Sequence, residues 1–194
     1  QGAKSSITVA AACACAGIVV GVVTLTGLGL GIANMIVQLA GGNLFLTLLF
    51  TMCASIILGM GLPTTAKYIV LATMAAPALI SLNVHLMAAH LFILYFGVVA
   101  DITPPVALAA YAGAGIAKGN PMRTGINATK LAIGAFLIPY IFIMSPQLLL
   151  IDITFFGAIR VAIGALIGML AVEAAVQGWL IKHANVVERV LLLV

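Results

Sequence analysis

The chain has 194 residues, of which 64% are hydrophobic and 6% are charged. Soluble domains contain roughly 45–50% apolar and about 25% charged residues, and they need those polar groups to cover their surface. This composition excludes an ordinary soluble enzyme and a disordered chain. The net charge of +4 comes from scattered lysines and arginines without a basic cluster, which excludes a nucleic-acid-binding protein.

The spacing of the charges indicates a multi-pass membrane protein. No charged residue occurs between Lys4 and Lys67, and none between Lys67 and Asp101. A membrane-spanning helix needs about 20 apolar residues, so each gap has room for membrane segments. The three cysteines lie in apolar runs without metal-ligand spacing, so no bound cofactor is predicted. The first residue, Gln1, and the unfinished apolar run at the other end predict a fragment of a longer membrane protein, with residues 1–194 as one transmembrane region.

Residues 7–42 are predicted to form a span, Ile7–Thr26, followed by glycines and a short helix, Ile32–Ala40. Residues 43–80 then show two apolar arms, Leu44–Leu58 and Ala66–Leu79, on either side of a Gly/Pro-rich stretch. The first arm reaches only about 22 Å, which is less than the ~30 Å hydrocarbon core. Two short arms around a polar tip therefore predict a re-entrant hairpin.

Residues 85–118 are predicted to form one helix that is broken at Asp101–Pro105. Pro104 and Pro105 have no N–H groups, so the carbonyls of Ala100 and Asp101 lose their helical donors. Two further spans are predicted at 121–144 and 153–181. With the open end of the hairpin outside, five basic residues fall on the inner side, as the positive-inside rule requires: Lys4, Lys118, Arg123, Lys182 and Arg189.

The two breaks are the candidate functional site. Broken helices in transporters present unwound carbonyls to Na⁺ and half-helix N-termini to anions. Proline at position 63 removes the helical donor of the Gly59 carbonyl, and Thr64 and Thr103 add hydroxyls. The predicted cation ligands are Gly59, Thr64, Ala100, Asp101 and Thr103. The wider set for substrate and ion is Gly59, Gly61, Pro63, Thr64, Thr65, Ala100, Asp101, Thr103, Pro104 and Pro105.

Asp101 and Lys67 are ionisable residues next to these breaks, and such groups within a membrane are functional candidates. Asp101 is expected to hold a cation, carry a proton or pair with Lys67. Lys67 is expected to attract an anionic substrate, pair with Asp101 or extend toward the interface. The alternative reading of both motifs is that their prolines are simple kinks whose threonine hydroxyls bond back to the helix.

The stretches GMGLPTTAKYI (59–69) and AHLFILYFGVVADITPPVALAAYAGAGIAKGNP (89–121) resemble the large permease component of TRAP (tripartite ATP-independent periplasmic) transporters. The stretches TLTGLGL (24–30) and IPYIFIMSPQLLL (138–150) are also similar, and the closer match is the fused permease of the TAXI type.

The resemblance implies an all-α membrane protein with elevator-type inverted repeats, each with a re-entrant hairpin and a discontinuous helix. It implies Na⁺-coupled secondary transport of an organic acid (a carboxylate) across the bacterial inner membrane, not an enzymatic activity. The implied partners are an extracytoplasmic solute-binding protein, a small membrane subunit or its fused equivalent, and the N-terminal repeat of the same permease. This chain resembles the second repeat.

Three alternatives are weighed against this function. A proton-coupled transporter of similar architecture would use the same breaks with a different ion. A non-catalytic membrane subunit would need them for assembly alone. An intramembrane aspartyl protease would need a second acid beside Asp101, and Asp152 and Glu173 are expected near opposite membrane surfaces.

Overall fold

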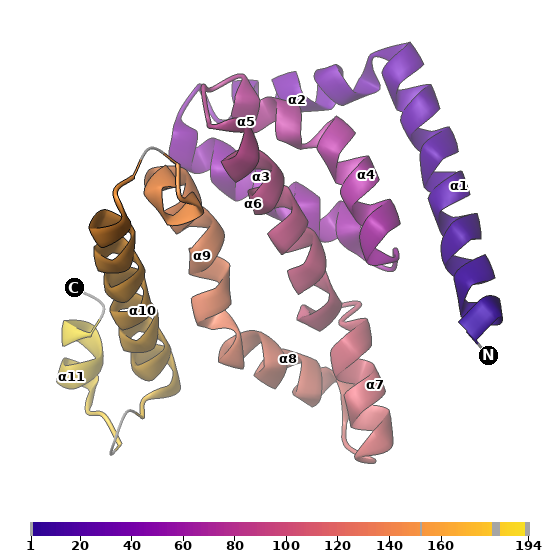
Figure 1. Ribbon diagram of the computed structural model, residues 1–194. Helices are drawn as coiled ribbons and strands as arrows, with labels where there is room; N and C mark the ends of the chain where they lie inside the picture. Colours follow the sequence, from indigo (N-terminus) through magenta and orange to yellow (C-terminus); the bar gives the residue numbers. More distant parts are fainter. Residues whose placement is uncertain (1, 152, 180–182, 193–194) are drawn as a thin grey trace. The chain divides into compact units, whose positions relative to one another are not determined.

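The computed structural model describes residues 2–151, 153–179 and 183–192, and every regular element among them is a helix (Figure 1). This confirms the prediction of an all-α protein. The chain divides into two compact units, Gln1–Asp101 and Ile102–Val194, which are described separately. Asp152 and Lys182, which the predicted topology uses, lie outside the described residues.

The first unit consists of six α-helices and leads into a 3₁₀ turn. In chain order they are α1 (Gly2–Thr26), α2 (Leu28–Leu39), α3 (Leu44–Gly59), α4 (Thr64–Met74), α5 (Ala76–Ile80), α6 (Leu86–Val99) and the turn η1 (Ala100–Ile102).

Helices α1 and α2 meet at a bend of 72°. Gly27 adopts a left-handed conformation there, with φ of 69°, which ends the first helix. The prediction that α2 begins only at residue 32 is wrong, because Gly29 and Gly31 lie inside it. Gly29 faces α4 so closely that a Cβ atom would lie 2.5 Å from the carbonyl oxygen of Thr73.

Helices α3 and α4 form two short arms joined at the residue 60–63 turn (Figure 1). Gly61 at the turn has φ of 77°, and Pro63 precedes the first residue of α4. Helix α4 also packs against α1, where Ala16, Ala66 and Val70 form a buried apolar cluster. The second arm ends earlier than predicted, because α5 is a separate short helix with Pro77 in its first turn.

Helix α6 supplies the buried centre of this unit. Phe92 and Phe96 are fully buried, and their rings pack edge to face with their centroids 4.8 Å apart. The Tyr68 hydroxyl of α4 lies 3.0 Å from His90 Nδ1 of α6 and so links these two helices. The helix ends at Val99, so Asp101 lies in the η1 turn immediately beyond it.

The second unit contains a further five α-helices and one 3₁₀ helix among its described residues. They are α7 (Leu108–Ile116), α8 (Pro121–Leu131), α9 (Ile133–Met144), η2 (Pro146–Leu149), α10 (Phe155–Gln177) and α11 (Val186–Leu191).

Helix α7 begins at Leu108, whereas the predicted break ends at Pro105. The Pro104–Pro105 peptide bond is cis, and Ala107 has a left-handed conformation with φ of 33°. A right-handed helix cannot include Ala107 in this conformation, so it resumes one residue later. The break is therefore longer than predicted, and the segment between η1 and α7 covers residues 103–107.

The predicted span 121–144 is two helices, α8 and α9, with a bend of 43° at Ala132. Helix α8 carries Arg123, Asn127 and Lys130, whereas α9 has no charged residue. The Glu173 carboxylate of α10 lies against Gly134 in the first turn of α9, where a Cβ atom would be 2.9 Å from Glu173 Oε1. An acidic group at this end suits the helix dipole of α9.

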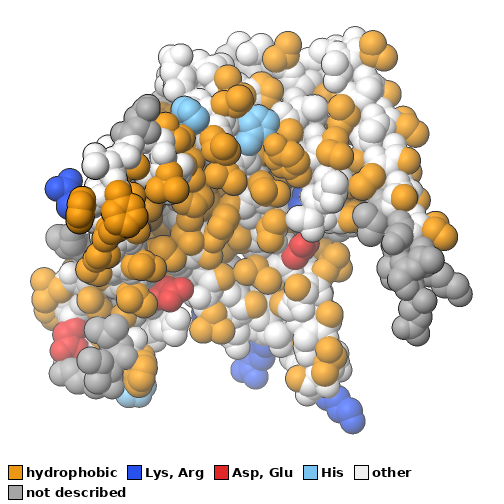
Figure 2. All heavy atoms as spheres, viewed as in Figure 1, with side chains coloured by type: hydrophobic (Ala, Val, Ile, Leu, Met, Phe, Trp, Pro, Cys, Tyr) orange, Lys and Arg blue, Asp and Glu red, His pale blue; other side chains and the backbone are white. Residues whose placement is uncertain are grey.

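By length and composition, α10 is the described helix that can cross a membrane by itself, and the bent pairs α1–α2 and α8–α9 each qualify as a broken span. Helices α3 and α6 are apolar but shorter. Figure 2 shows hydrophobic side chains over most of the visible surface, with few charged groups between them. This surface is that of a membrane protein.

Candidate functional site

An ion pair joins the hairpin to the end of α6. Lys67 Nζ of α4 donates a hydrogen bond to Asp101 Oδ1 at 2.9 Å. The Lys67 side chain is 1% exposed and the Asp101 side chain is 31% exposed. A buried ammonium is costly without a partner, so the carboxylate offsets a charge that the fold places deep inside this unit. Of the interpretations left open by the sequence, the structure shows the one in which Lys67 and Asp101 pair.

Two glycines make room for the lysine. A Cβ atom on Gly59 would lie 3.1 Å from Gly97 Cα and 3.3 Å from Lys67 Cδ. A Cβ atom on Gly97 would lie 2.8 Å from Leu71 Cδ1 and 3.2 Å from Lys67 Cδ. The end of α3 and the last turns of α6 therefore contact each other backbone to backbone, and the lysine stem crosses this contact. We call Gly59 and Gly97 the glycine notch.

The hairpin tip is more open than the notch. Gly61, Thr64 and Thr65 are exposed, and Pro63 is half-buried. Pro63 at the N-cap position of α4 makes no side-chain hydrogen bond to the helix. The first N–H groups of α4 therefore have no capping acceptor from this residue. The tip therefore offers N–H donors and threonine hydroxyls at one helix N-terminus, a combination that suits an anion.

Helix α3 carries a buried polar face that sequence reasoning missed. Thr47, Thr51, Ser55 and Gly59 recur every four residues, which places them on one side of the helix, and all are buried. The Thr47 hydroxyl donates to the Asn43 carbonyl. The hydroxyls of Thr51 and Ser55 have no hydrogen-bond partner among the described residues. The four-residue spacing was visible in the sequence and could have identified this face.

The second unit satisfies two backbone oxygens of its own break. The Thr129 hydroxyl of α8 donates to the Ile102 carbonyl at 3.1 Å, and the Tyr111 hydroxyl of α7 donates to the Pro105 carbonyl at 2.8 Å. Gly125 lies against this segment, because a Cβ atom there would be 3.2 Å from Pro104 Cγ. Thr129 and Tyr111 are further residues that the sequence analysis did not single out.

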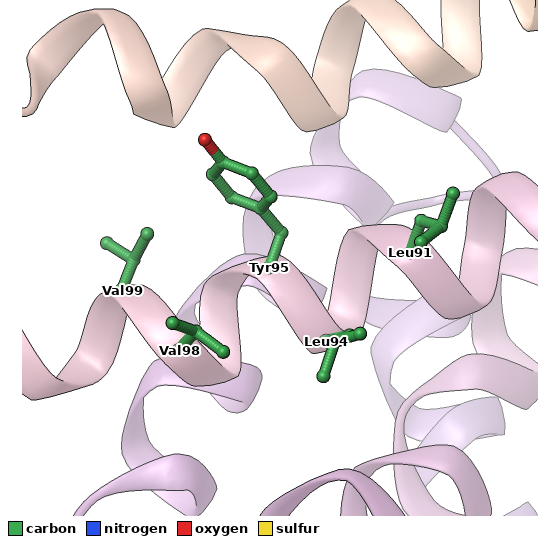
Figure 3. A pocket seen from close by; sticks show the side chains of 5 residues that line it. All are labelled: Leu91, Leu94, Tyr95, Val98 and Val99. Carbon is green, nitrogen blue, oxygen red and sulfur yellow. The ribbon is translucent and has the colours of Figure 1, made fainter. Parts of the chain in front are cut away.

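A groove of about 350 Å³ lies along α6 (Figure 3). It is lined by Leu91, Leu94, Tyr95, Val98 and Val99. The Tyr95 hydroxyl is its one polar side-chain group, and none of these residues carries a charge. The groove therefore lacks the donors that a carboxylate requires, and it is not the candidate site.

The structure brings together part of the predicted set. Gly59 lies in the notch beside Lys67, and Asp101 pairs with that lysine, while Ala100 is buried next to Asp101 in the chain. The remaining residues lie on the exposed tip or in the segment after η1. The tip residues are Gly61, Pro63, Thr64 and Thr65, and the segment contains Thr103, Pro104 and Pro105.

The described residues contain no group of three or more histidine, cysteine, aspartate or glutamate side chains that could hold a metal ion. In broken-helix transporters, unwound backbone carbonyls and half-helix ends hold monovalent cations without such a group.

An all-helical membrane protein with interrupted helices and an ion pair between two breaks belongs, as a class, with secondary transporters. The family described as "Tripartite ATP-independent periplasmic transporter, DctM component" matches residues 1–156. The chain belongs to this family, and its role is therefore in ATP-independent transport and not in enzymatic catalysis. No curated protein and no solved structure matched the chain.

Proposed function

We propose that this permease imports an organic acid across the bacterial inner membrane by coupling it to the entry of Na⁺. The observation that carries this proposal is the Lys67–Asp101 ion pair, which joins the hairpin and the break after α6 at 2.9 Å. A positive group for a carboxylate and a negative group for a cation therefore lie in direct contact.

The anion side of the proposal rests on α4. Lys67 lies one turn from the start of this helix, and its backbone N–H already bonds to the Pro63 carbonyl. The ammonium and the free N–H groups at Thr64 and Thr65 both favour negative charge. A small organic acid fits these donors better than a neutral solute does.

The cation side rests on oxygen atoms at the two breaks. Asp101 supplies a carboxylate that is a third exposed. The Gly59 carbonyl has no helical donor, because the residue four positions further on is Pro63. Thr64, Ala100 and Thr103 complete the proposed ligand set. Na⁺ in this proposal is a co-transported substrate and not a resident cofactor.

The family description names a tripartite transporter, which supports two partners for this component. We infer an extracytoplasmic solute-binding protein that delivers the acid, and a small membrane subunit or its fused equivalent. The stretches at 24–30, 59–69 and 89–121 favour the TAXI-type fused form and an elevator-type second repeat.

Uptake into proteoliposomes tests this function. The permease is reconstituted with its solute-binding protein, and labelled organic acids are offered under an inward Na⁺ gradient or an equal choline gradient. Uptake that needs Na⁺ supports the proposal. Uptake driven by a pH gradient in choline would instead identify the proton-coupled alternative, and failure of every gradient to drive uptake would favour a non-transporting subunit.

A further inference from the structure

We propose that the Lys67–Asp101 ion pair is a resting contact that the two substrates open together. A carboxylate of the organic acid replaces Asp101 on the Lys67 ammonium, and the released Asp101 carboxylate binds the cation. This inference rests on the proposed function and deepens it, because it assigns the coupling of the two substrates to one exchange of partners.

Lys67 is the fixed member of the pair. Its side chain is 1% exposed, and its stem is enclosed by the glycine notch, with Cδ near the Cβ positions of both Gly59 and Gly97. Leu71, one turn further along α4, closes the same contact. The ammonium therefore stays in place and needs a negative partner at all times.

Asp101 is the member that can leave. It lies in the three-residue η1 turn beyond the end of α6, and its side chain is 31% exposed. Rotation of this short side chain moves the carboxylate toward the exposed side without displacing a helix. The Asp101 side chain is less enclosed than the Lys67 side chain, so it is the member of the pair that can move.

The arriving group must have the chemistry of the group that it replaces. An ammonium has three N–H donors. Among the described residues, Lys67 Nζ donates one hydrogen bond, to Asp101 Oδ1. As the Asp101 side chain rotates outward, a substrate carboxylate takes its place on these N–H donors. Lysine remains paired throughout, and no step exposes an uncompensated ammonium.

The exchange makes carboxylate and cation binding depend on each other. Asp101 competes with the substrate carboxylate for the Lys67 ammonium, and Lys67 competes with the cation for the Asp101 carboxylate. A cation that captures Asp101 therefore raises the affinity for the carboxylate, and thermodynamic linkage requires the reverse effect to be equal. An acid and a cation that each bind weakly alone then bind well together.

Sodium binding to the purified permease tests this exchange without any transport assay. Calorimetric titration with NaCl against choline chloride is carried out on the wild type, Lys67→Met and Lys67→Met/Asp101→Asn. Methionine keeps the apolar stem in the notch and removes the charge. We expect Lys67→Met to bind Na⁺ about tenfold or more tightly than the wild type, because the competing ammonium is absent. The double variant is expected to lose this gain.

Asp101→Asn supplies the reciprocal measurement, with acetate as the carboxylate probe in Na⁺-free choline buffer. Removal of the competing carboxylate is expected to strengthen acetate binding and to raise the melting temperature of this variant with acetate concentration. Lys118→Met, which changes an exposed lysine in the turn after α7, is the control and is expected to match the wild type in both titrations.

Equal Na⁺ affinity in Lys67→Met and the wild type would overturn the exchange. If Lys67→Met does not fold, the acetate titration decides alone, and acetate binding to Asp101→Asn that is no stronger than to the wild type would overturn it. Failure of the proposed function is distinguished from these outcomes, because it shows as wild-type uptake that is independent of Na⁺.

Discussion

Gly59 and Gly97 contact each other backbone to backbone where the hairpin meets the last turns of α6. A Cβ atom on Gly59 would lie 3.1 Å from Gly97 Cα, and the stem of Lys67 passes along the same contact. This notch explains how a lysine can be almost fully buried and still reach Asp101. The two interrupted segments are therefore held together by packing as well as by charge.

Gly97→Ala is expected to destabilise the permease by about 1–3 kcal/mol, because the new methyl group overlaps Leu71 Cδ1 and the lysine stem. Gly113→Ala, at a position with no atom within 4 Å of the added Cβ, is the matched control. Thermal unfolding in detergent measures both. Equal melting temperatures for the two variants would contradict the close packing of the notch.

The two members of the ion pair are expected to differ in their effect on stability. Asp101→Ala leaves a buried ammonium without a partner and should cost about 3–5 kcal/mol. Lys67→Met leaves a carboxylate that is 31% exposed and should cost about 1 kcal/mol or less. Adding Lys67→Met to Asp101→Ala should restore part of the loss. A double-mutant cycle on unfolding free energy checks this, and additive losses would show that the pair does not interact.

Gly29→Ala tests the packing of α2 against α4. A Cβ atom there would lie 2.5 Å from the Thr73 carbonyl oxygen, so the helices must separate, at about 1–3 kcal/mol. Gly31→Ala lies two residues further along the same helix in open space and should leave the melting temperature unchanged or raise it slightly. A melting temperature for Gly29→Ala equal to that of Gly31→Ala would place the two helices further apart than described.

The predicted topology is tested by cysteine accessibility. Asn43 and Asn120 are both exposed and both cap the helix that follows them, so Asn→Cys removes the same kind of contact at each site. Cys13, Cys15 and Cys53 are free and must be replaced first. A membrane-impermeant thiol reagent should label position 43 from outside and position 120 from inside. Labelling of both positions from one side would refute the predicted topology.

The hairpin arms could be predicted from the sequence because proline and glycine interrupt an apolar run visibly. The first arm was expected at Leu44–Leu58 and is found at Leu44–Gly59. The bend at Ala132 was missed, because no proline or glycine occupies that position. Its signal is the change from the charged helix α8 to the uncharged α9.

The candidate site was foreseen in its residue types but not in its packing. The sequence left open whether Lys67 pairs with Asp101, since 34 residues separate them and only tertiary structure brings them to 2.9 Å. Gly97 was not singled out, because a single glycine in an apolar helix gives no local sign of the lysine that crosses it. Thr129 and Tyr111 were missed for the same reason, as their acceptors are carbonyls of another segment.

We propose that the two breaks hold both the coupling ion and the substrate. Sodium-dependent uptake by proteoliposomes that contain Thr64→Ala, Thr103→Ala or Asp101→Asn tests it most directly, with expression and folding verified for each variant. We expect lower uptake and an altered dependence on Na⁺ concentration in these variants. Normal uptake with an unchanged Na⁺ dependence in all three would contradict it.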